Sequence, residues 1–356
     1  MLDDRQSRQL SLPPRPPGFA ETSIPPLTDR QGRTYRYLRL SVTDRCDLAC
    51  RYCMPPSGEE DHARRKALLT FEEAARLVRV LAAGGIERVR FTGGEPLVRK
   101  GVVELVAQVH RSAPRVRLAM TTNGTRLGEL AGPLRLAGLD GVNVSLDTLD
   151  PERFRSLTRG GDIGRVKAGI HAALAEGLEV KLNVVPLRHH PASDDDLRAL
   201  VDWAWSLGIT PRFIELMPLG EGAKLPASWR MSTLEVRTLL GERLADGHAE
   251  TPEGPLGPAR YVPSRHGTGR VGFISAMSDE FCDTCNRLRV TARGDVRACL
   301  ADRRAVSLRD VMRGGGSDAD LAWAIRWALG GKADGHFFAD PRATEHENVG
   351  MSLVGG

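Results

Sequence analysis

Residues 37–53 of this 356-residue chain read YLRLSVTDRCDLACRYC, and the rest of the sequence is organised around them. The first six residues alternate apolar and polar side chains, which predicts a β-strand. Three cysteines follow, Cys46, Cys50 and Cys53. Three thiolates on one short loop can hold three corners of a cubane iron–sulfur cluster and leave the fourth iron open. A structural zinc site is the alternative. Such sites usually close with a fourth ligand at similar spacing, but the nearest candidate here, His62, comes nine positions after Cys53.

Composition limits the class of protein. The charged fraction of 27% and the apolar fraction of 41% are typical of a soluble globular protein. No apolar run approaches the ~20 residues that span a bilayer, and the Pro-rich N-terminus lacks the apolar core of a signal peptide. We therefore predict a cytoplasmic protein with no membrane partner. The net charge of +5 is spread along the chain without a basic and aromatic pattern, so no nucleic-acid partner is expected.

The remaining cysteines form a second group of three, Cys282, Cys285 and Cys299. Two tight groups in a long chain do not resemble the disulfide framework of a small secreted protein. Two sets of metal ligands in a reducing compartment are the simpler interpretation.

The order of predicted elements indicates an α/β fold. Residues 1–34 are rich in proline and predict a flexible or extended leader. Residues 35–221 contain six strand–helix units, which fit either a partial (βα)6 TIM-like barrel or a doubly wound sheet. Unusual residues follow strand after strand, as expected at the carboxyl ends of barrel strands, so the barrel is favoured. Residues 222–356 predict an α+β extension that carries the second cysteine group. The six strands are expected at 37–42, 88–92, 116–121, 142–146, 178–185 and 210–216, and the third is followed by Thr-Thr-Asn-Gly at 121–124. A capping box at Thr70–Glu73 predicts a helix that ends at Gly84-Gly85, and further helices are expected near 101–110, 127–136, 163–175 and 193–207.

Several residues indicate a bound anion. Arg287 and Arg289 alternate out of the second cysteine group, so both point to one side of a strand and suit a polyphosphate, unless that side is simply solvated. Lys181 lies in an apolar strand and should have an anionic partner, unless the strand register places it in solvent. Gly93 and Gly94 allow close approach of a ligand or form a tight turn. The chain has neither a dinucleotide-binding G-x-G-x-x-G nor a P-loop.

These motifs resemble a known family. Cys46-x3-Cys50-x2-Cys53, with Tyr52 before the last cysteine and Gly-Gly-Glu-Pro at 93–96, is similar to the radical S-adenosylmethionine (radical SAM) superfamily. Residues 38–46, the spacing of the second cysteine group, Asn-Arg-Leu-Arg at 286–289 and the final Gly355-Gly356 resemble more closely the family of GTP 3′,8-cyclases of molybdenum cofactor biosynthesis. The resemblance covers residues 35–356.

The resemblance implies two 4Fe-4S clusters with SAM as a further cofactor and GTP as the substrate. A 5′-deoxyadenosyl radical would remove the ribose 3′ hydrogen of GTP to give 3′,8-cyclo-7,8-dihydroguanosine 5′-triphosphate. Cys46, Cys50 and Cys53 would hold the catalytic cluster, and Cys282, Cys285 and Cys299 the second one. The implied SAM contacts are Tyr52, Gly94, Ser145 and Met217. The implied GTP contacts are Arg39, Arg90, Thr121, Lys181, Arg287 and Arg289.

The resemblance also implies an electron donor and the next enzyme of the pathway as partners, leaves a homodimer open, and predicts that the Gly-Gly tail reaches the active site. Asp47 departs from the asparagine that is usual in the family. Two alternatives remain. A different radical SAM enzyme with an auxiliary cluster could act on a peptide, and a non-catalytic iron–sulfur or zinc sensor would leave the strand-end motifs unexplained.

Overall fold

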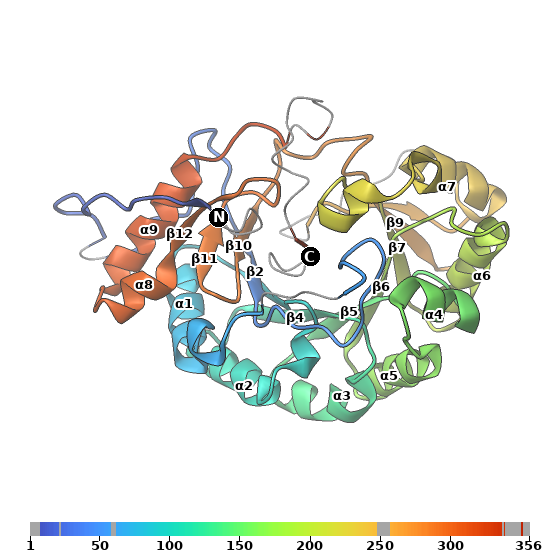
Figure 1. Cartoon of the computed structure of the whole chain (residues 1–356), viewed down its shortest axis with the longest axis horizontal. Coiled ribbons are helices and arrows are strands. Elements are labelled where there is room, and N and C mark those ends of the chain that lie inside the picture. Colours follow the sequence, from blue (N-terminus) through green and yellow to red (C-terminus); the bar gives the residue numbers. More distant parts are fainter. Residues whose placement is uncertain are drawn as a thin grey trace.

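The computed structural model describes residues 8–20, 23–57, 62–247, 257–336, 338 and 350–351. Within these residues the strands form one curved sheet (Figure 1) in the order β1-β12-β11-β10-β2-β3-β4-β5-β6-β7-β9-β8. The final Gly355-Gly356 lies outside the described residues. No helix in the described part of the chain has the length and apolar character needed to cross a membrane.

The six predicted strands lie side by side in chain order and pair in parallel. They are β2 (Tyr37–Ser41), β3 (Arg88–Thr92), β4 (Arg117–Thr122), β5 (Gly141–Ser145), β6 (Glu179–Val184) and β7 (Thr210–Ile214). The connecting helices are α1 (Phe71–Ala83), α2 (Val102–Ser112), α3 (Leu127–Leu136), α4 (Pro151–Thr158), α5 (Ile163–Ala175) and α6 (Ser193–Ser206). The predicted α/β partial barrel is confirmed. Helix α4 was not predicted.

The helices cover the outer face of the sheet (Figure 1) because each strand alternates its side chains. Leu38 and Leu40 of β2 are buried on this outer face with Val89 and Phe91 of β3. Helix α1 contributes apolar residues to the same core and begins at the predicted capping box, in which Thr70 accepts from the Glu73 backbone N–H. The inner face is consequently left to the polar residues of each strand.

The segment after residue 221 extends the sheet at both edges. Next to β7 lie β9 (Arg270–Ile274), which is parallel to it, and then β8 (Arg260–Pro263). Next to β2 lie β10 (Arg287–Val290), again parallel, and then β11 (Asp295–Arg297) and β12 (Arg304–Ser307). The helices of this segment are α7 (Thr233–Leu240), α8 (Leu308–Arg313) and α9 (Asp318–Gly330). The boundary at residue 221 stays a prediction.

Short 3₁₀ turns complete the connections. They are η1 (Arg65–Ala67), η2 (Pro96–Val98), η3 (Gly220–Lys224), η4 (Ala227–Trp229) and η5 (Gly241–Arg243).

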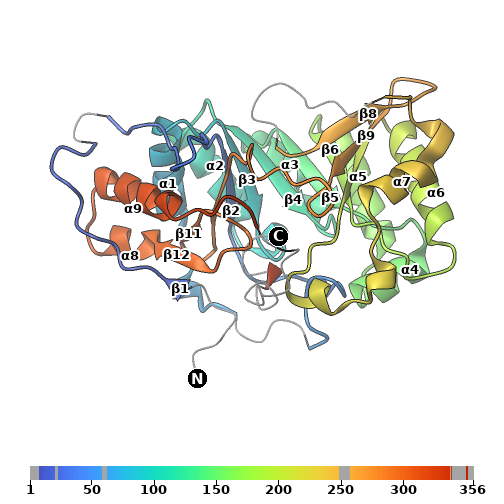
Figure 2. The same cartoon turned by 90° about the horizontal axis from the view of Figure 1, so that it is seen from above.

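The described part of the Pro-rich leader contacts the C-terminal segment. Strand β1 (Arg8–Gln9) pairs with β12, and Figure 2 shows it beside β12 and α8. The Trp323 Nε1–H of α9 donates to the Pro13 carbonyl at 2.9 Å, and Arg15 forms an ion pair with Asp320. Leu27 is buried in the main core. These contacts tie the described residues between 8 and 15 to helix α9 and strand β12, which a Pro-rich composition alone does not indicate.

Candidate functional site

The first cysteine loop follows the carboxyl end of β2. Cys46, Cys50 and Cys53 are half-buried, and none of them forms a disulfide. The loop is held from outside by the end of α4, because Ala49 and Arg51 donate backbone N–H groups to the carbonyls of residues 158 and 157. Arg159, at φ 54°, donates to the Ala49 and Met54 carbonyls at 2.8 Å. The unpredicted helix α4 therefore shapes the cysteine loop.

The loop after β3 packs directly under the cysteine loop. The Gly94 N–H donates to the Thr43 carbonyl at 2.9 Å, and the Glu95 N–H donates to the Arg45 carbonyl at 2.7 Å. A Cβ on Gly94 would lie 2.4 Å from the Arg45 carbonyl oxygen, a distance that no side chain tolerates. The close approach that Gly94 allows is therefore made by the backbone of the chain itself, at Arg45.

Acidic side chains surround the first cysteine loop. Asp47 accepts from Asn123 Nδ2 at 2.7 Å and from Thr125 Oγ1 at 2.6 Å. Asn123 Nδ2 also lies 3.9 Å from the Cys46 Sγ, and the Leu48 N–H lies 3.4 Å from the same sulfur. Burial raises the pKa of Cys46 to about 12, with the charges of nearby carboxylates adding to the effect.

A second carboxylate positions the loop that carries Asn123. Glu95 is buried and accepts from the Thr122 hydroxyl at 2.8 Å and from the Asn123 N–H at 2.6 Å. Burial raises the pKa of Glu95 to about 7 in spite of these hydrogen bonds. Sequence reasoning identified neither Asn123 nor the role of Glu95, although both lie in strand-end motifs that it singled out.

The other residues implied for SAM lie at neighbouring strand ends. Tyr52 donates its hydroxyl to Asp147 Oδ2 at 2.8 Å, and Asp147 Oδ1 accepts from the Val185 N–H at 2.8 Å. Ser145 is the last residue of β5 and pairs with Asn183 of β6. Met217 follows β7 and packs against Leu219. Tyr52, Gly94, Ser145 and Met217 thus come from the first cysteine loop and from the ends of β3, β5 and β7.

The second cysteine group lies at the opposite end of β2. Arg287 of β10 is in register with Tyr37 at the start of β2, and Cys285 precedes it by two residues. Cys299 follows β11, which runs antiparallel to β10 and so returns to the same end. The length of β2 separates the two groups, and its four residue steps span about 13 Å.

Basic side chains surround this second group. Arg287 Nη2 lies 3.7 Å from the Cys285 Sγ, and Arg33 Nη1 donates to the Cys282 carbonyl at 3.1 Å. Burial opposes ionisation of Cys285, but the positive charges of Arg287 and Lys332 outweigh it and lower the pKa of the thiol to about 6. All three cysteines are half-buried and free. Glu280 and His336, which sequence reasoning did not single out, bring ligand atoms within 4.8 Å of each other and of the Cys282 Sγ.

Buried arginines occupy the inner face between the two groups. The register places Arg39 of β2 between Arg90 of β3 and Arg289 of β10. Arg90 Nε donates to the Tyr37 hydroxyl. Burial opposes ionisation of Tyr37, but the charges of Arg90 and Arg39 outweigh it and lower the pKa of the phenol to about 8. Arg289 is 6% exposed, and its Nη1 has no hydrogen-bond partner among the described residues.

The concentration of positive charge disturbs the arginines themselves. Burial, with Arg39 and Arg287 adjacent, lowers the pKa of Arg289, and burial lowers the pKa of Arg39 to about 10. Arg212 of β7, which sequence reasoning missed, is also buried on this face and donates to Asn183 at 2.5 Å. Its charge in an apolar strand is the same signal that drew attention to Lys181. A face with this much uncompensated charge fits an anionic ligand.

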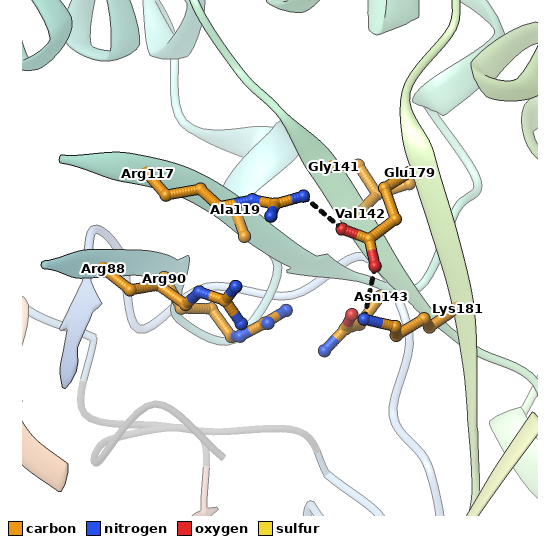
Figure 3. Close-up of a pocket in the computed structure, with 9 residues that line it drawn as sticks. All are labelled: Arg88, Arg90, Arg117, Ala119, Gly141, Val142, Asn143, Glu179 and Lys181. Carbon is orange, nitrogen blue, oxygen red and sulfur yellow. Dashed lines mark hydrogen bonds and ion pairs between the residues drawn. The ribbon is translucent and has the colours of Figure 1, made fainter. Parts of the chain in front are cut away.

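The last two residues implied for GTP lie further round the sheet. Thr121 of β4 is in register with Asn143, and Asn143 with Lys181 of β6. The Thr121 hydroxyl has no hydrogen-bond partner within the described part of the chain. Lys181 has the anionic partner that its position predicts, because Glu179 forms an ion pair with it. Lys181 and Glu179 line a pocket (Figure 3) with Arg88, Arg90, Arg117, Ala119, Gly141, Val142 and Asn143.

Both cysteine groups have the chemistry of iron–sulfur ligands. Each offers three thiols outside any disulfide, and each has an N–H donor directed at a sulfur, from Leu48 to Cys46 and from Arg287 to Cys285. Hydrogen bonds of this kind to ligand sulfurs are common at clusters and tune their potential. An open parallel barrel with such a three-cysteine loop at the carboxyl end of its first barrel strand defines a radical SAM protein.

Comparison with known proteins gives the particular family. Residues 40–204 match the Radical SAM superfamily model, and residues 209–338 match the model Molybdenum Cofactor Synthesis C. The chain is 43% identical to the GTP 3′,8-cyclase of Caulobacter vibrioides over 99% of both chains. It is 45% identical to that of Heliobacterium modesticaldum, covering 93% of this chain and 100% of the relative. The chain therefore belongs to the GTP 3′,8-cyclase family of radical SAM enzymes, as the motifs predicted.

Solved structures give weaker matches. A structure of Streptococcus suis SuiB bound to the precursor peptide SuiA has a TM-score of 0.47 and 18% sequence identity. The match covers 58% of this chain and 44% of that one.

Proposed function

We propose that this chain converts GTP to 3′,8-cyclo-7,8-dihydroguanosine 5′-triphosphate, the first step of molybdenum cofactor biosynthesis. Membership of the family supports the reaction. The observation that carries the proposal for this chain is the placement of two cysteine groups at opposite ends of a face lined by buried arginines. A substrate held by that face would lie between two metal centres.

The first centre would be a 4Fe-4S cluster on Cys46, Cys50 and Cys53. Once bound, such a cluster and SAM would supply the radical chemistry needed to join the ribose 3′ carbon of GTP to C8 of guanine. The chain orients SAM with Tyr52, Gly94, Ser145 and Met217. Asp147 fixes the Tyr52 ring through the phenol hydrogen bond, which supports a positioning role for that carboxylate.

The second centre would be a 4Fe-4S cluster on Cys282, Cys285 and Cys299, beside which the guanine is held. Arg287 and Arg289 extend from this end of the face toward Arg39 and Arg90. Guanidinium groups bind phosphate oxygens in pairs and stay charged when buried, so they suit the triphosphate. Thr121 and Lys181 complete the proposed GTP contacts.

The proposal includes an electron donor, transfer of product to the next enzyme of the pathway and a cytoplasmic location, where reduced thiols persist. A homodimer is compatible with it. The deciding experiment is anaerobic turnover with reductant, SAM and GTP. We expect consumption of GTP with formation of 5′-deoxyadenosine and the cyclised nucleotide. Turnover on a peptide without GTP would refute the assignment, and zinc or a single cluster in metal and sulfide analysis would refute the two-cluster site.

A variant tests the phosphate role of the arginine face. Arg289→Ala should weaken GTP binding by about tenfold or more, since a buried charge-assisted contact is lost. Iron bound by the first cysteine group should not change. Arg287→Ala should weaken GTP binding as well, but its contact with the Cys285 sulfur makes an effect on the second cluster expected too. Arg135→Ala, an exposed arginine of α3, is the control. Equal GTP affinity of Arg289→Ala and Arg135→Ala in a direct binding assay would contradict the phosphate role.

A further inference from the structure

The pocket in Figure 3 contains one acidic side chain among basic ones. Arg88, Arg90, Arg117 and Lys181 line it together with Glu179. Glu179 is the first residue of β6, and Lys181 is the third, so both side chains point to the inner face of the sheet. A carboxylate inside a site suited to phosphate opposes the binding of phosphate.

Glu179 is held between two cations. Its Oε1 forms an ion pair with Lys181 Nζ, and its Oε2 accepts from Arg117 Nη2 at 2.5 Å. Burial raises the pKa of Glu179, but the hydrogen bond from Lys181 and the charges of Lys181 and Arg117 outweigh burial, so the pKa is lowered overall. The side chain is therefore a carboxylate at neutral pH, with one oxygen on each cation.

The arrangement conflicts with the role proposed for Lys181. An ammonium that contacts a GTP phosphate would bring that phosphate next to the Glu179 carboxylate, and like charges at contact distance repel. Arg117 can reduce this repulsion, because it binds the other carboxylate oxygen and can keep Glu179 in place when Lys181 turns to a phosphate. Arg117 lies on β4, across β5 from Glu179, and is about half exposed.

We propose that Glu179 competes with the phosphate groups of the nucleotide for Lys181. In the empty site it neutralises Lys181, and on binding it gives this cation up and remains paired with Arg117. The inference rests on the proposed function, because it assumes that a nucleotide triphosphate occupies the face. Since GTP and the cyclised product carry the same triphosphate, the competition weakens the hold on both and speeds release of the product.

The test uses the anaerobically prepared protein with its clusters. Glu179→Gln keeps the shape of the side chain and an oxygen acceptor for Lys181 but removes the charge. A partly exposed ion pair of this kind is worth little, so we expect GTP to bind roughly two- to fivefold more tightly. The gain should shrink with GMP and vanish with guanosine, which has no phosphate. Glu104→Gln is the matched control, since Glu104 binds Arg111 at 3.0 Å on the outer helix α2 with similar exposure.

A double variant tests whether Lys181 is the group through which Glu179 acts. If Glu179 acts through Lys181, adding Glu179→Gln to Lys181→Gln should give a smaller gain in GTP affinity than in the parent protein. Unchanged or weaker GTP binding by Glu179→Gln, or an equal gain with guanosine, would overturn the proposal. Failure of the unmodified protein to bind GTP would instead refute the proposed function, and with it this inference, so the two failures are distinguishable.

Discussion

Asp47→Asn offers a test of how the chain sets the potential of its first cluster. Asp47 accepts from Asn123 Nδ2 and from Thr125 Oγ1. The Thr125 hydroxyl also lies 2.8 Å from Asn123 Oδ1, so it can donate there and accept from an amide at position 47. The substitution therefore removes a negative charge and preserves the hydrogen-bonded network.

The structure bounds the size of the effect. Asn123 Nδ2 is 2.7 Å from Asp47 Oδ1 and 3.9 Å from the Cys46 Sγ, so the carboxylate oxygen lies no more than about 6.6 Å from this sulfur. A unit charge at that distance changes the energy of an added electron by about 0.6 kcal/mol in water and about 2.5 kcal/mol at an effective dielectric constant near 20. For a one-electron couple this range corresponds to about 25 to 110 mV. Because Asp47 is exposed in the structure, the lower half of the range is expected.

Redox titration followed by electron paramagnetic resonance measures the shift. The signal that changes on addition of SAM belongs to the first cluster and separates it from that of the proposed second cluster. Removal of a negative charge favours reduction, so the midpoint of Asp47→Asn should move to a more positive potential. Asp202→Asn, whose carboxylate binds Arg243 near the outer helices, is the control. A midpoint that stays fixed or becomes more negative would refute the electrostatic reasoning.

Two further predictions concern the stability of the fold, and the first of them also concerns the iron content of the first cysteine group. Gly94→Ala should destabilise the fold by about 1–3 kcal/mol and reduce the iron held by the first cysteine group, because the added Cβ meets the Arg45 backbone. Gly128→Ala is the control, since open space surrounds that position and neither effect is expected there. Equal iron content in the two variants would contradict this reasoning. Hydrogen bonds from Ser232, with Arg188, lower the pKa of Glu235 to about 2 from 4.5, so its contribution is present above pH 4.5 and is lost as the pH falls toward 2. Glu235→Ala should therefore lower the free energy of unfolding by about 0.5 kcal/mol at pH 7, which is the low end for a cap at an exposed site, and by less at pH 3. Urea titrations at the two pH values measure this difference. An equal loss at both would show that the ionised carboxylate is not the source of the stabilisation.

Local patterns predicted the barrel well. Alternation of apolar and polar residues located all six barrel strands to within two residues at either end, because that alternation is the physical cause of their two faces. The capping box at Thr70 located α1 for a similar reason. Helix α7 has the same signature, Ser232 with Glu235, and went unpredicted although the signal was present. Pairing of β10 with β2 joins residues about 250 positions apart, and no local pattern specifies it.

Prediction of the site was limited in the same way. The family resemblance implied Arg39, Arg90, Thr121 and Lys181 as GTP contacts, and the register of the strands lays them along one face. Periodicity could not give partners that depend on neighbouring strands. The hold of Glu179 on Lys181 involves Arg117 two strands away, and the contact of Asn123 with Asp47 joins the loops that follow β2 and β4. The SAM and GTP contacts themselves stay predictions, since the structure places these residues without a ligand.

The two cysteine groups differ in electrostatic environment, and this difference fits two different tasks. Carboxyl groups of Asp47, Glu95 and Asp147 surround the first group, and the negative charge that they carry when ionised makes addition of an electron harder and the reduced cluster a stronger reductant. In the second group Arg287 and Lys332 lie beside Cys285 and keep its pKa near 6, although Glu280 lies beside Cys282, so the local field that favours the Cys285 thiolate also favours an anionic ligand there. In the proposed function the chain reduces SAM at one end and holds a triphosphate toward the other, which needs this asymmetry, and the intervening arginine face continues the positive field along the sheet. Exchange of the two charge environments should thus impair both tasks, even with all six cysteines in place.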